Sequence, residues 1–234
     1  MSHEALRRVV WEANLDIVKG GLVELTWGNA SGLDREAGVV AIKPSGVAYD
    51  DLTPEHIVLV SLESGKTLEG SLRPSSDTPT HLHLYRCFDG IGGIVHTHSL
   101  HAVAWAQAAR DLPCFGTTHA DHFNGAVPVT ARMSPEEIRT DYERNTGIVI
   151  EACFRSKHIE PMDVPAVLVA GHGPFTWGTT VDEAVLNAVV LESVARMALH
   201  TVTINPEARP ISGRLLEKHF GRKHGPDAYY GQDD

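Results

Sequence analysis

A His-x-His pair follows an apolar run in the middle of this chain. The run covers residues 91–95 and leads directly into His96-Thr97-His98. If the run is a β-strand, residues two apart project from the same face, so both imidazoles would point the same way. Two neutral imidazoles side by side provide half of a transition-metal site, whereas surface histidines that fall two apart by chance are the ordinary alternative. The spacing by itself leaves both interpretations open.

A third histidine lies in a similar setting further along the chain. His172 follows a second apolar run and stands between Gly171 and Gly173. If the two strands are neighbours, three histidines meet with one coordination position left for substrate, which is typical of a catalytic metal site. The alternative is a metal-storing or structural zinc protein, which would have a closed set of four ligands and no phosphate loop nearby.

Two polar loops have the composition of phosphate-binding segments. The first covers residues 26–32 and is followed by Lys43-Pro44-Ser45-Gly46, and the second covers residues 73–80. Backbone N–H groups at glycines, serines and a helix start can cradle a phosphate, and a lysine adds a point charge. Ordinary turns and caps use the same residue types. In the second loop, Asp77 could ligate a metal, handle a proton or cap the following helix.

A third loop, residues 116–125, combines histidines with a carboxylate. His119 and His122 flank Asp121, a mixture that suits general acid/base chemistry but also occurs in solvated surface loops. A second His-x-His pair, His81 and His83, falls within a predicted helix, where residues two apart face different directions. We therefore interpret that pair as structural. A Schiff-base aldolase that uses Lys43 as its nucleophile is a further enzyme alternative.

Helices and strands alternate along the chain and must position these groups. Hydrophobic periodicity and capping residues predict helices over residues 6–17, 80–88, 101–109, 134–157, 180–203 and 215–225. Apolar runs predict strands over residues 39–42, 57–62, 94–98 and 164–170. This alternation predicts an α/β protein, and the direction of the strands is left open. Because no linker or repeat interrupts the pattern, we expect one domain over residues 1–234.

The composition of the chain excludes several classes of function. Its 234 residues, 42% of them apolar, suffice for a full core, and the net charge of −10 argues against a nucleic-acid-binding surface. No run approaches about 18 consecutive apolar residues, so no membrane span is expected. The N-terminus lacks a secretory leader, and the three cysteines form no Cys-x-x-Cys pair, which indicates a reducing cytoplasm. Any metal would therefore be held by histidine and carboxylate.

The loops and histidines together resemble the L-ribulose-5-phosphate 4-epimerases of the class II aldolase/epimerase superfamily. The resemblance extends in order along nearly the whole chain. The matching stretches are residues 25–29, 42–46, 73–81, 92–99, 116–121, 171–175 and 223–232. The resemblance implies a single-domain α/β fold of the class II aldolase type, with a central, mainly antiparallel β-sheet flanked by helices on both faces.

The resemblance also implies a role for each site residue. The implied metal ligands are Asp77, His96, His98 and His172. The residues implied to bind the substrate and its phosphate are Gly28, Asn29, Lys43, Ser45, Gly46, Ser75 and Ser76. Asp121 and Tyr230 would be the acid/base pair, and they would reach the metal from a neighbouring subunit of a C4 homotetramer. Related aldolases carry a glutamate at the position of Asp77, so the aspartate favours an epimerase.

The implied reaction interconverts L-ribulose 5-phosphate and D-xylulose 5-phosphate. The C4 hydrogen is not α to the C2 carbonyl, so simple deprotonation there yields no stabilised carbanion. A retro-aldol cleavage of the C3–C4 bond leaves an enediolate whose charge Zn²⁺ would stabilise, and re-formation on the other face of the aldehyde inverts C4. A class II sugar-phosphate aldolase is the nearest alternative. Mn²⁺ and Co²⁺ suit the same ligands, and both an arabinose and an ascorbate or xylulose pathway remain open.

Overall fold

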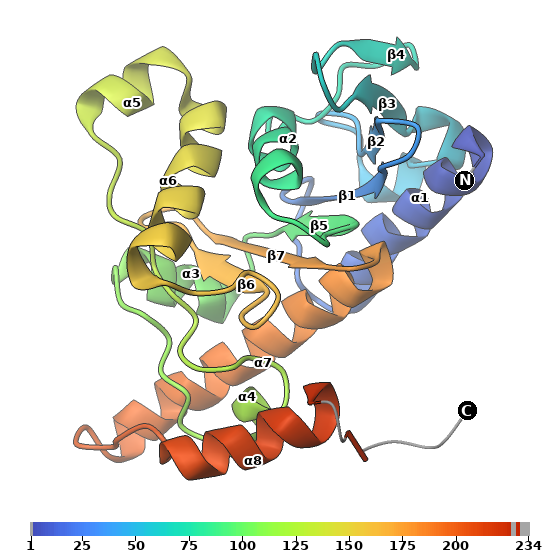
Figure 1. The fold of residues 1–234 in the computed structure, drawn as a ribbon. Helices are drawn as coiled ribbons and strands as arrows, with labels where there is room; N and C mark the ends of the chain where they lie inside the picture. The colour runs from blue at the N-terminus through green and yellow to red at the C-terminus, as the bar shows by residue number, and fades with distance from the viewer. Residues whose placement is uncertain (1, 226–227, 230–234) are drawn as a thin grey trace.

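Within residues 2–225 and 228–229, which the computed structural model describes, a seven-stranded sheet forms the centre of the molecule (Figure 1). The strands are β1 (Asn29–Asp34), β2 (Val39–Ile42), β3 (Val58–Ser61), β4 (Thr67–Glu69), β5 (Gly93–His96), β6 (Ala166–Leu168) and β7 (Pro174–Gly178). Their order across the sheet is β4-β3-β2-β1-β5-β7-β6, and each neighbouring pair is antiparallel. The expected antiparallel sheet is therefore confirmed.

Eight α-helices accompany the sheet in the described part of the chain. They are α1 (His3–Lys19), α2 (Thr78–Cys87), α3 (Leu100–Gln107), α4 (Thr117–Ala120), α5 (Pro135–Thr140), α6 (Tyr142–Lys157), α7 (Val181–Ile204) and α8 (Gly213–His224). Two short 3₁₀ turns, Tyr49–Asp51 and Pro54–His56, lie between β2 and β3. Hydroxyl side chains cap two of the long helices: Thr180 caps α7, as predicted, and Ser2 caps α1, which begins three residues before the predicted start at residue 6.

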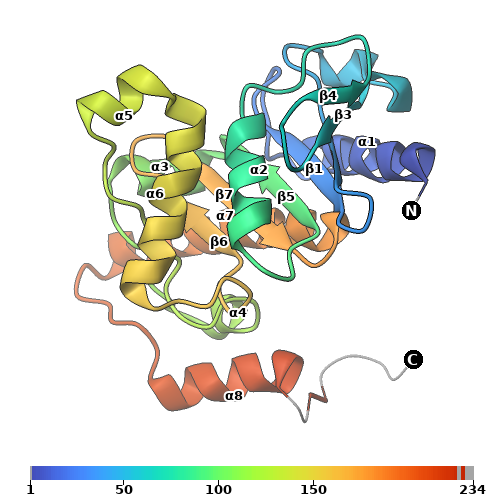
Figure 2. The same ribbon diagram turned by 45° about the horizontal axis from the view of Figure 1, so that its top comes forward.

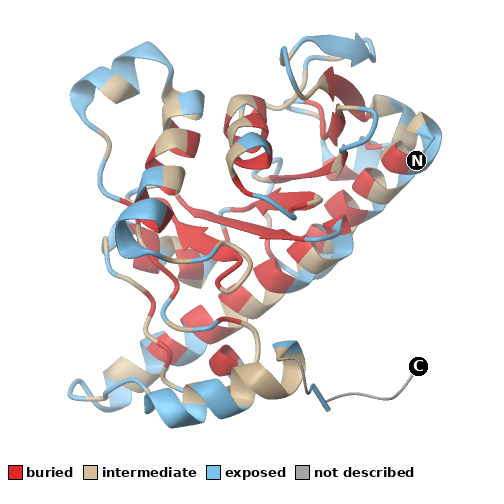
Figure 3. Cartoon of the chain, in the orientation of Figure 1, coloured by how far each residue is buried: buried red, intermediate tan, exposed pale blue. Residues whose placement is uncertain are grey.

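Alternate residues of the strands face two separate apolar clusters. Val39 and Ala41 of β2 pack in a cluster with α1 and the start of α7, whereas Val40 packs in a cluster with α2 and α6. This division follows from the two-residue period of a strand. Figure 2 shows α2 and α6 side by side, and Figure 3 shows the buried residues concentrated on the sheet and the inner helix faces. A third cluster lies between α3, β6 and the C-terminal half of α7.

Small residues in β1 and β5 allow α7 to approach the sheet closely. A Cβ atom on Gly32 would lie 2.7 Å from the Val181 side chain, and one on Gly93 would lie 2.4 Å from the Val181 Cα atom. These contacts explain why β1 lacks the apolar alternation of an ordinary strand. The expectation that residues 26–32 are a loop is accordingly wrong for its second half, because residues from Asn29 onward are paired with β2 and β5.

Helix α7 is the one described helix that could cross a membrane by length and composition alone. It instead packs along the sheet, and eight of its residues are buried. Glu192, near its middle, accepts hydrogen bonds from the backbone of His101 and Ala102 at the start of α3. In this fold α7 is therefore a core helix.

The predicted helix over residues 134–157 is divided in two. Its start is correct, because Ser134 and Glu137 form a reciprocal capping box. At Asp141 the backbone leaves the helical region, with φ −149° and ψ 68°, and α6 begins at the next residue. Because of this break, Tyr142 and Glu143 are the first residues of a helix, whereas the predicted helix had them in its interior.

Candidate active site

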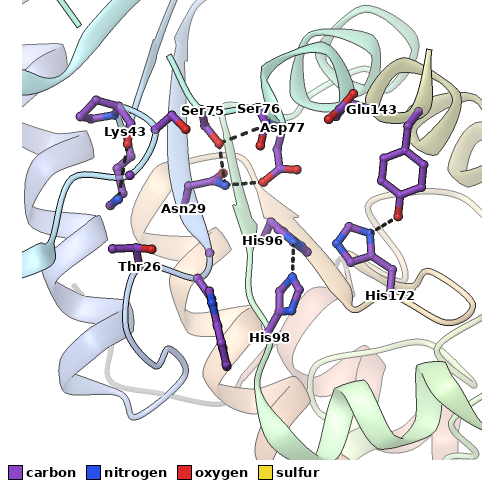
Figure 4. Close-up of a pocket in the computed structure, with 16 residues that line it drawn as sticks. Thr26, Asn29, Lys43, Ser75, Ser76, Asp77, His96, His98, Glu143 and His172 are labelled. Atoms are coloured by element: carbon purple, nitrogen blue, oxygen red, sulfur yellow. Dashed lines mark hydrogen bonds between the residues drawn. The ribbon is translucent and has the colours of Figure 1, made fainter. Parts of the chain in front are cut away.

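Three histidines converge at the end of the central strand β5. His96 is the last residue of β5, His98 lies two residues further in the loop to α3, and His172 lies in the turn between β6 and β7 (Figure 4). The expectation that one strand carries both residues of the His-x-His pair is wrong, because β5 ends at His96. The two apolar runs are also not neighbours, since β7 stands between β5 and β6. The β6–β7 turn nevertheless brings His172 to the pair.

The geometry of the three imidazoles fits a bound metal ion. Their donor atoms all lie within 4.8 Å of one another, and the Nε2 atoms of His96 and His98 are 3.1 Å apart. His96 Nδ1 lies 2.9 Å from the Pro174 carbonyl oxygen, which can only accept, so Nδ1 is the donor in this contact and Nε2 is the atom left to face a metal ion. Two nitrogen ligands of a tetrahedral zinc ion, each at ~2.0–2.1 Å, are about 3.3 Å apart.

The charge states around the histidines also suit a cation. Burial lowers the pKa of His98 and lowers that of His172 to about 3, so both rings are neutral at neutral pH. For Asp77, burial opposes ionisation, but the surrounding histidines, His96 foremost, and the hydrogen bond from Asn29 together outweigh it and lower the pKa. The pocket therefore presents the neutral imidazoles of His98 and His172 beside the ionised carboxylate of Asp77.

Asp77 is held by an amide rather than by the helix that it precedes. It occupies the N-cap position of α2 but makes no capping hydrogen bond through its side chain, so the helix-cap alternative is wrong. Its Oδ2 atom accepts a hydrogen bond of 2.7 Å from Asn29 Nδ2, which also donates to Ser75 Oγ at 3.1 Å. Asp77 lines the same pocket as the three histidines, and its place among the metal ligands stays a prediction.

The two predicted phosphate loops lie side by side. The backbone N–H of Ser45 donates to the Arg73 carbonyl, and that of Ser75 donates to the Lys43 carbonyl, each at 3.0 Å. Lys43 is almost fully buried, and its Nζ donates to the Val47 carbonyl at 2.7 Å. Because burial disfavours the charged amine, the pKa of Lys43 is lowered to about 8. Two segments far apart in the sequence thus form one polar wall.

Gly28 joins the polar wall to the cluster of histidines. Its φ of 96° lies in the left-handed region, and a Cβ atom there would lie 2.7 Å from the carbonyl oxygen of His96. Only glycine therefore allows the chain entering β1 to pass this close to the end of β5.

One pocket contains nearly all of the residues selected from the sequence. It is lined by the seven residues expected to bind substrate and by the four expected metal ligands, together with Thr26, Trp27, Pro44, Tyr142 and Glu143. The hydroxyl of Tyr142 lies 3.3 Å from His172 Nδ1. Sequence reasoning missed Tyr142 and Glu143 because it placed both inside a continuous helix. Asp141, a residue type that often begins helices, was the available signal.

Asp121, one member of the expected acid/base pair, does not belong to this pocket. Asp121 lies at the end of α4 and does not line the pocket. Its carboxylate accepts a bidentate pair of hydrogen bonds from Arg222 and one of 2.9 Å from His219, both in α8. Burial opposes ionisation of Asp121, but these two partners outweigh it and lower the pKa. Tyr230 lies outside the described residues.

In the second His-x-His pair, His81 packs inside the protein and His83 lies nearer the surface. His81 is fully buried and its Nδ1 lies 2.7 Å from Ser31 Oγ, whereas His83 points away from it and contacts Glu151 of α6. The two rings face different directions because they lie on one helix.

Comparison with known proteins identifies the family. Residues 8–199 match the family described as the class II aldolase and adducin N-terminal domain. The chain belongs to this family. It is also 52% identical, over 98% of its own length and 99% of the relative's, to the L-ribulose-5-phosphate 4-epimerase UlaF of Salmonella paratyphi B.

Solved structures share the class II aldolase fold of this chain. An L-fuculose 1-phosphate aldolase superposes with a TM-score of 0.78 at 23% identity, covering 94% of this chain and 97% of its own. The L-fuculose 1-phosphate aldolase of Glaciozyma antarctica PI12 superposes with a TM-score of 0.76 at 18% identity, covering 97% of this chain and 84% of its own. At these identities the likeness supports the fold, and the class II aldolase fold expected from the sequence is confirmed.

Proposed function

We propose that this chain is a metal-dependent epimerase that interconverts L-ribulose 5-phosphate and D-xylulose 5-phosphate. The observation that carries the proposal is a single pocket that holds three histidines on one side and the paired loops of Lys43 and Ser75 on the other. A sugar phosphate needs both contacts. The relative that shares 52% of its residues with this chain over nearly their whole lengths bears the name of this activity.

The metal would be held by His96, His98 and His172, with Asp77 as a further ligand. Zn²⁺, or Mn²⁺ or Co²⁺ in its place, supplies a Lewis acid for the charge that develops when the C3–C4 bond breaks. The Nδ1 atom of His96 bonds the Pro174 carbonyl and Asn29 bonds Asp77, so the protein fixes the orientation of both side chains before any ion binds.

The phosphate would be bound by the wall formed from the two loops. The hydroxyls of Ser45, Ser75 and Ser76 and the Lys43 amine would supply donors and one positive charge, and Gly46 lines the same wall. With its phosphate held there, the two-carbon aldehyde fragment stays in the pocket and turns to present its other face, which the inversion at C4 requires.

Proton transfer to and from the C4 oxygen would fall to Asp121 and Tyr230 of a neighbouring subunit. This arrangement is supported by the position of Asp121, which does not line the pocket of its own chain. We accordingly propose a C4 homotetramer with active sites between subunits, in which helices cover both faces of each sheet. We also propose one domain over residues 1–234 and a cytoplasmic location, in keeping with the free thiols of the three cysteines.

The decisive experiment is the conversion of L-ribulose 5-phosphate by the purified protein supplied with Zn²⁺. D-xylulose 5-phosphate should form, and a chelator should abolish its formation. Net release of glycolaldehyde phosphate and dihydroxyacetone without epimer would instead identify a class II aldolase. A mixture of Asp121→Asn and His98→Ala subunits should regain part of the activity that each variant lacks, whereas an absence of rescue would contradict a site shared between subunits.

A further inference from the structure

A second group of metal-ligating side chains lies outside the pocket, between α2 and α6. His83 and Cys87 are one helical turn apart on α2, so both project from the same side of that helix. Glu151 faces them from α6, and its Oε2 atom lies 2.8 Å from His83 Nε2. One ligand atom from each of the three residues lies within 4.8 Å of the other two. None of them lines the pocket described above.

The close approach of the two helices brings these side chains together. Gly147 lies one turn before Glu151 on α6, and a Cβ atom there would lie 2.8 Å from the Cβ atom of His83. Any larger residue would force the helices apart at this point. The backbone therefore holds His83 against α6, and Glu151 reaches it from the next turn.

We propose that His83, Cys87 and Glu151 bind a thiophilic divalent cation such as Zn²⁺ and so link α2 to α6. Imidazole, thiolate and carboxylate together suit Zn²⁺, Cd²⁺ or Co²⁺ and do not suit Mg²⁺ or Ca²⁺, which prefer oxygen ligands alone. Three protein ligands leave a fourth position for water.

The three side chains can be reached from solvent, and the positive charge of Arg155 competes with a cation for Glu151. The side chains of His83 and Glu151 are 20% and 23% exposed, so an ion can enter from solvent. Burial and the Glu151 carboxylate raise the pKa of Cys87 to about 12, and a bound cation would favour the thiolate instead. Arg155 pairs with Glu151 from the next turn of α6. Because the Arg155 side chain is 77% exposed, it can turn away into solvent.

A cation at this place would act on the pocket through the two helices. Asp77 stands at the N-terminal end of α2, and Tyr142 and Glu143 begin α6. All three line the pocket. Linking α2 to α6 would therefore fix the relative positions of two parts of the pocket wall.

Titration of the metal-free full-length protein with Co²⁺ tests the proposal. The pocket contains no cysteine among its lining residues, so a thiolate-to-cobalt charge-transfer band reports on the second cluster alone. The band should be present in the unmodified protein and in the matched variants Cys114→Ser and Cys153→Ser, and absent from Cys87→Ser. Absence of the band from the unmodified protein, or its persistence in Cys87→Ser, would overturn the proposal.

Substitutions of Glu151 and Arg155 should change the affinity for Co²⁺ in opposite directions. Unfolding of a variant could only weaken binding, so it could not produce this pair of results. Glu151→Gln should weaken Co²⁺ binding at the thiolate band by about tenfold or more, because it removes a charged ligand. Arg155→Ala should tighten binding severalfold by removing the competitor for Glu151. Arg139→Ala, which removes a similar exposed ion pair with Glu136, should leave binding unchanged. Equal affinity in the Glu151→Gln variant would exclude Glu151 as a ligand and contradict the site.

Discussion

Asn29 Nδ2 donates a hydrogen bond of 2.7 Å to Asp77 Oδ2, which ties the first residue of β1 to the residue before α2. The same amide nitrogen donates to Ser75 Oγ, so one side chain contacts both the predicted phosphate loop and the carboxylate beside the histidines. The oxygen of this amide is buried and has no partner among the described residues.

Replacing Asn29 with alanine should weaken metal binding. The Asp77 carboxylate would lose its donor, and loss of such an outer hydrogen bond typically costs about 10- to 100-fold in metal affinity. Competition with a chromogenic chelator measures the change directly. Asn145→Ala, which removes an amide bonded to the Glu137 carbonyl away from the pocket, serves as the control and should bind metal normally. Unchanged affinity in Asn29→Ala would contradict Asp77 as a ligand.

The pKa of Lys43 predicts how phosphate binding depends on pH. The free amine has a pKa of about 8 instead of the ordinary 10.5, because burial disfavours its charge. The proposed phosphate contact needs the charged amine, so the affinity for inorganic phosphate should fall as the pH rises above about 8, by up to about tenfold per pH unit. Isothermal titration calorimetry measures this slope. In Lys43→Met the affinity should be weaker and the slope should vanish, and an identical slope in both proteins would exclude Lys43 as its source.

Alanine substitutions at two glycines with positive φ, Gly46 and Gly28, allow the stability cost of backbone strain to be distinguished from that of steric overlap. Gly46, with φ 71°, has no atom within 4 Å of the place that a Cβ atom would take, so Gly46→Ala should cost only the strain of about 1–2 kcal/mol. Gly28→Ala adds an overlap with the His96 carbonyl oxygen and should cost about 3–4 kcal/mol. Urea unfolding of both variants gives the difference. Equal losses would show that the chain can move away from His96 at no cost.

The contact of Asp121 with α8 should depend on pH. Its pKa in the folded protein lies below the ordinary 3.8, so the contact contributes fully above that value and is lost as the pH falls through the lowered pKa. The protection factors of the α8 amides, which correct for the pH dependence of intrinsic exchange, should accordingly fall in acid. In Asp121→Asn the exchange should be fast at neutral pH as well. Asp111→Asn, which removes the partner of Lys157 elsewhere, is the control and should leave α8 protected.

The fold could be predicted from the sequence where local pattern and tertiary environment agree. Residues 39–42 form β2 as predicted, and the helix capped by Thr180 is α7. Strand β1 escaped prediction because its small polar residues are selected by the helix packed over them, a cause that no local window contains. The division of α5 from α6 at Asp141 was missed for a related reason, since helical periodicity continues across the break.

The candidate site was predictable in its composition but not in its geometry. The three histidines and the two loops were recognisable by type and spacing, and the pocket brings them together. His98 reaches the site from a loop rather than a strand, and Tyr142 enters only because the chain restarts a helix there. Both facts depend on contacts between distant segments, which spacing along the sequence does not encode.

The position of β5 has a consequence for how the protein loses activity. This strand is hydrogen-bonded on both sides, to β1 and to β7, so His96 belongs to the part of the backbone that opens last. Helix α8, which holds Asp121, has no fully buried residue and should separate early. Under gradually harsher conditions the enzyme should therefore become an inactive metal-binding protein first, and release its metal only when the sheet itself unfolds.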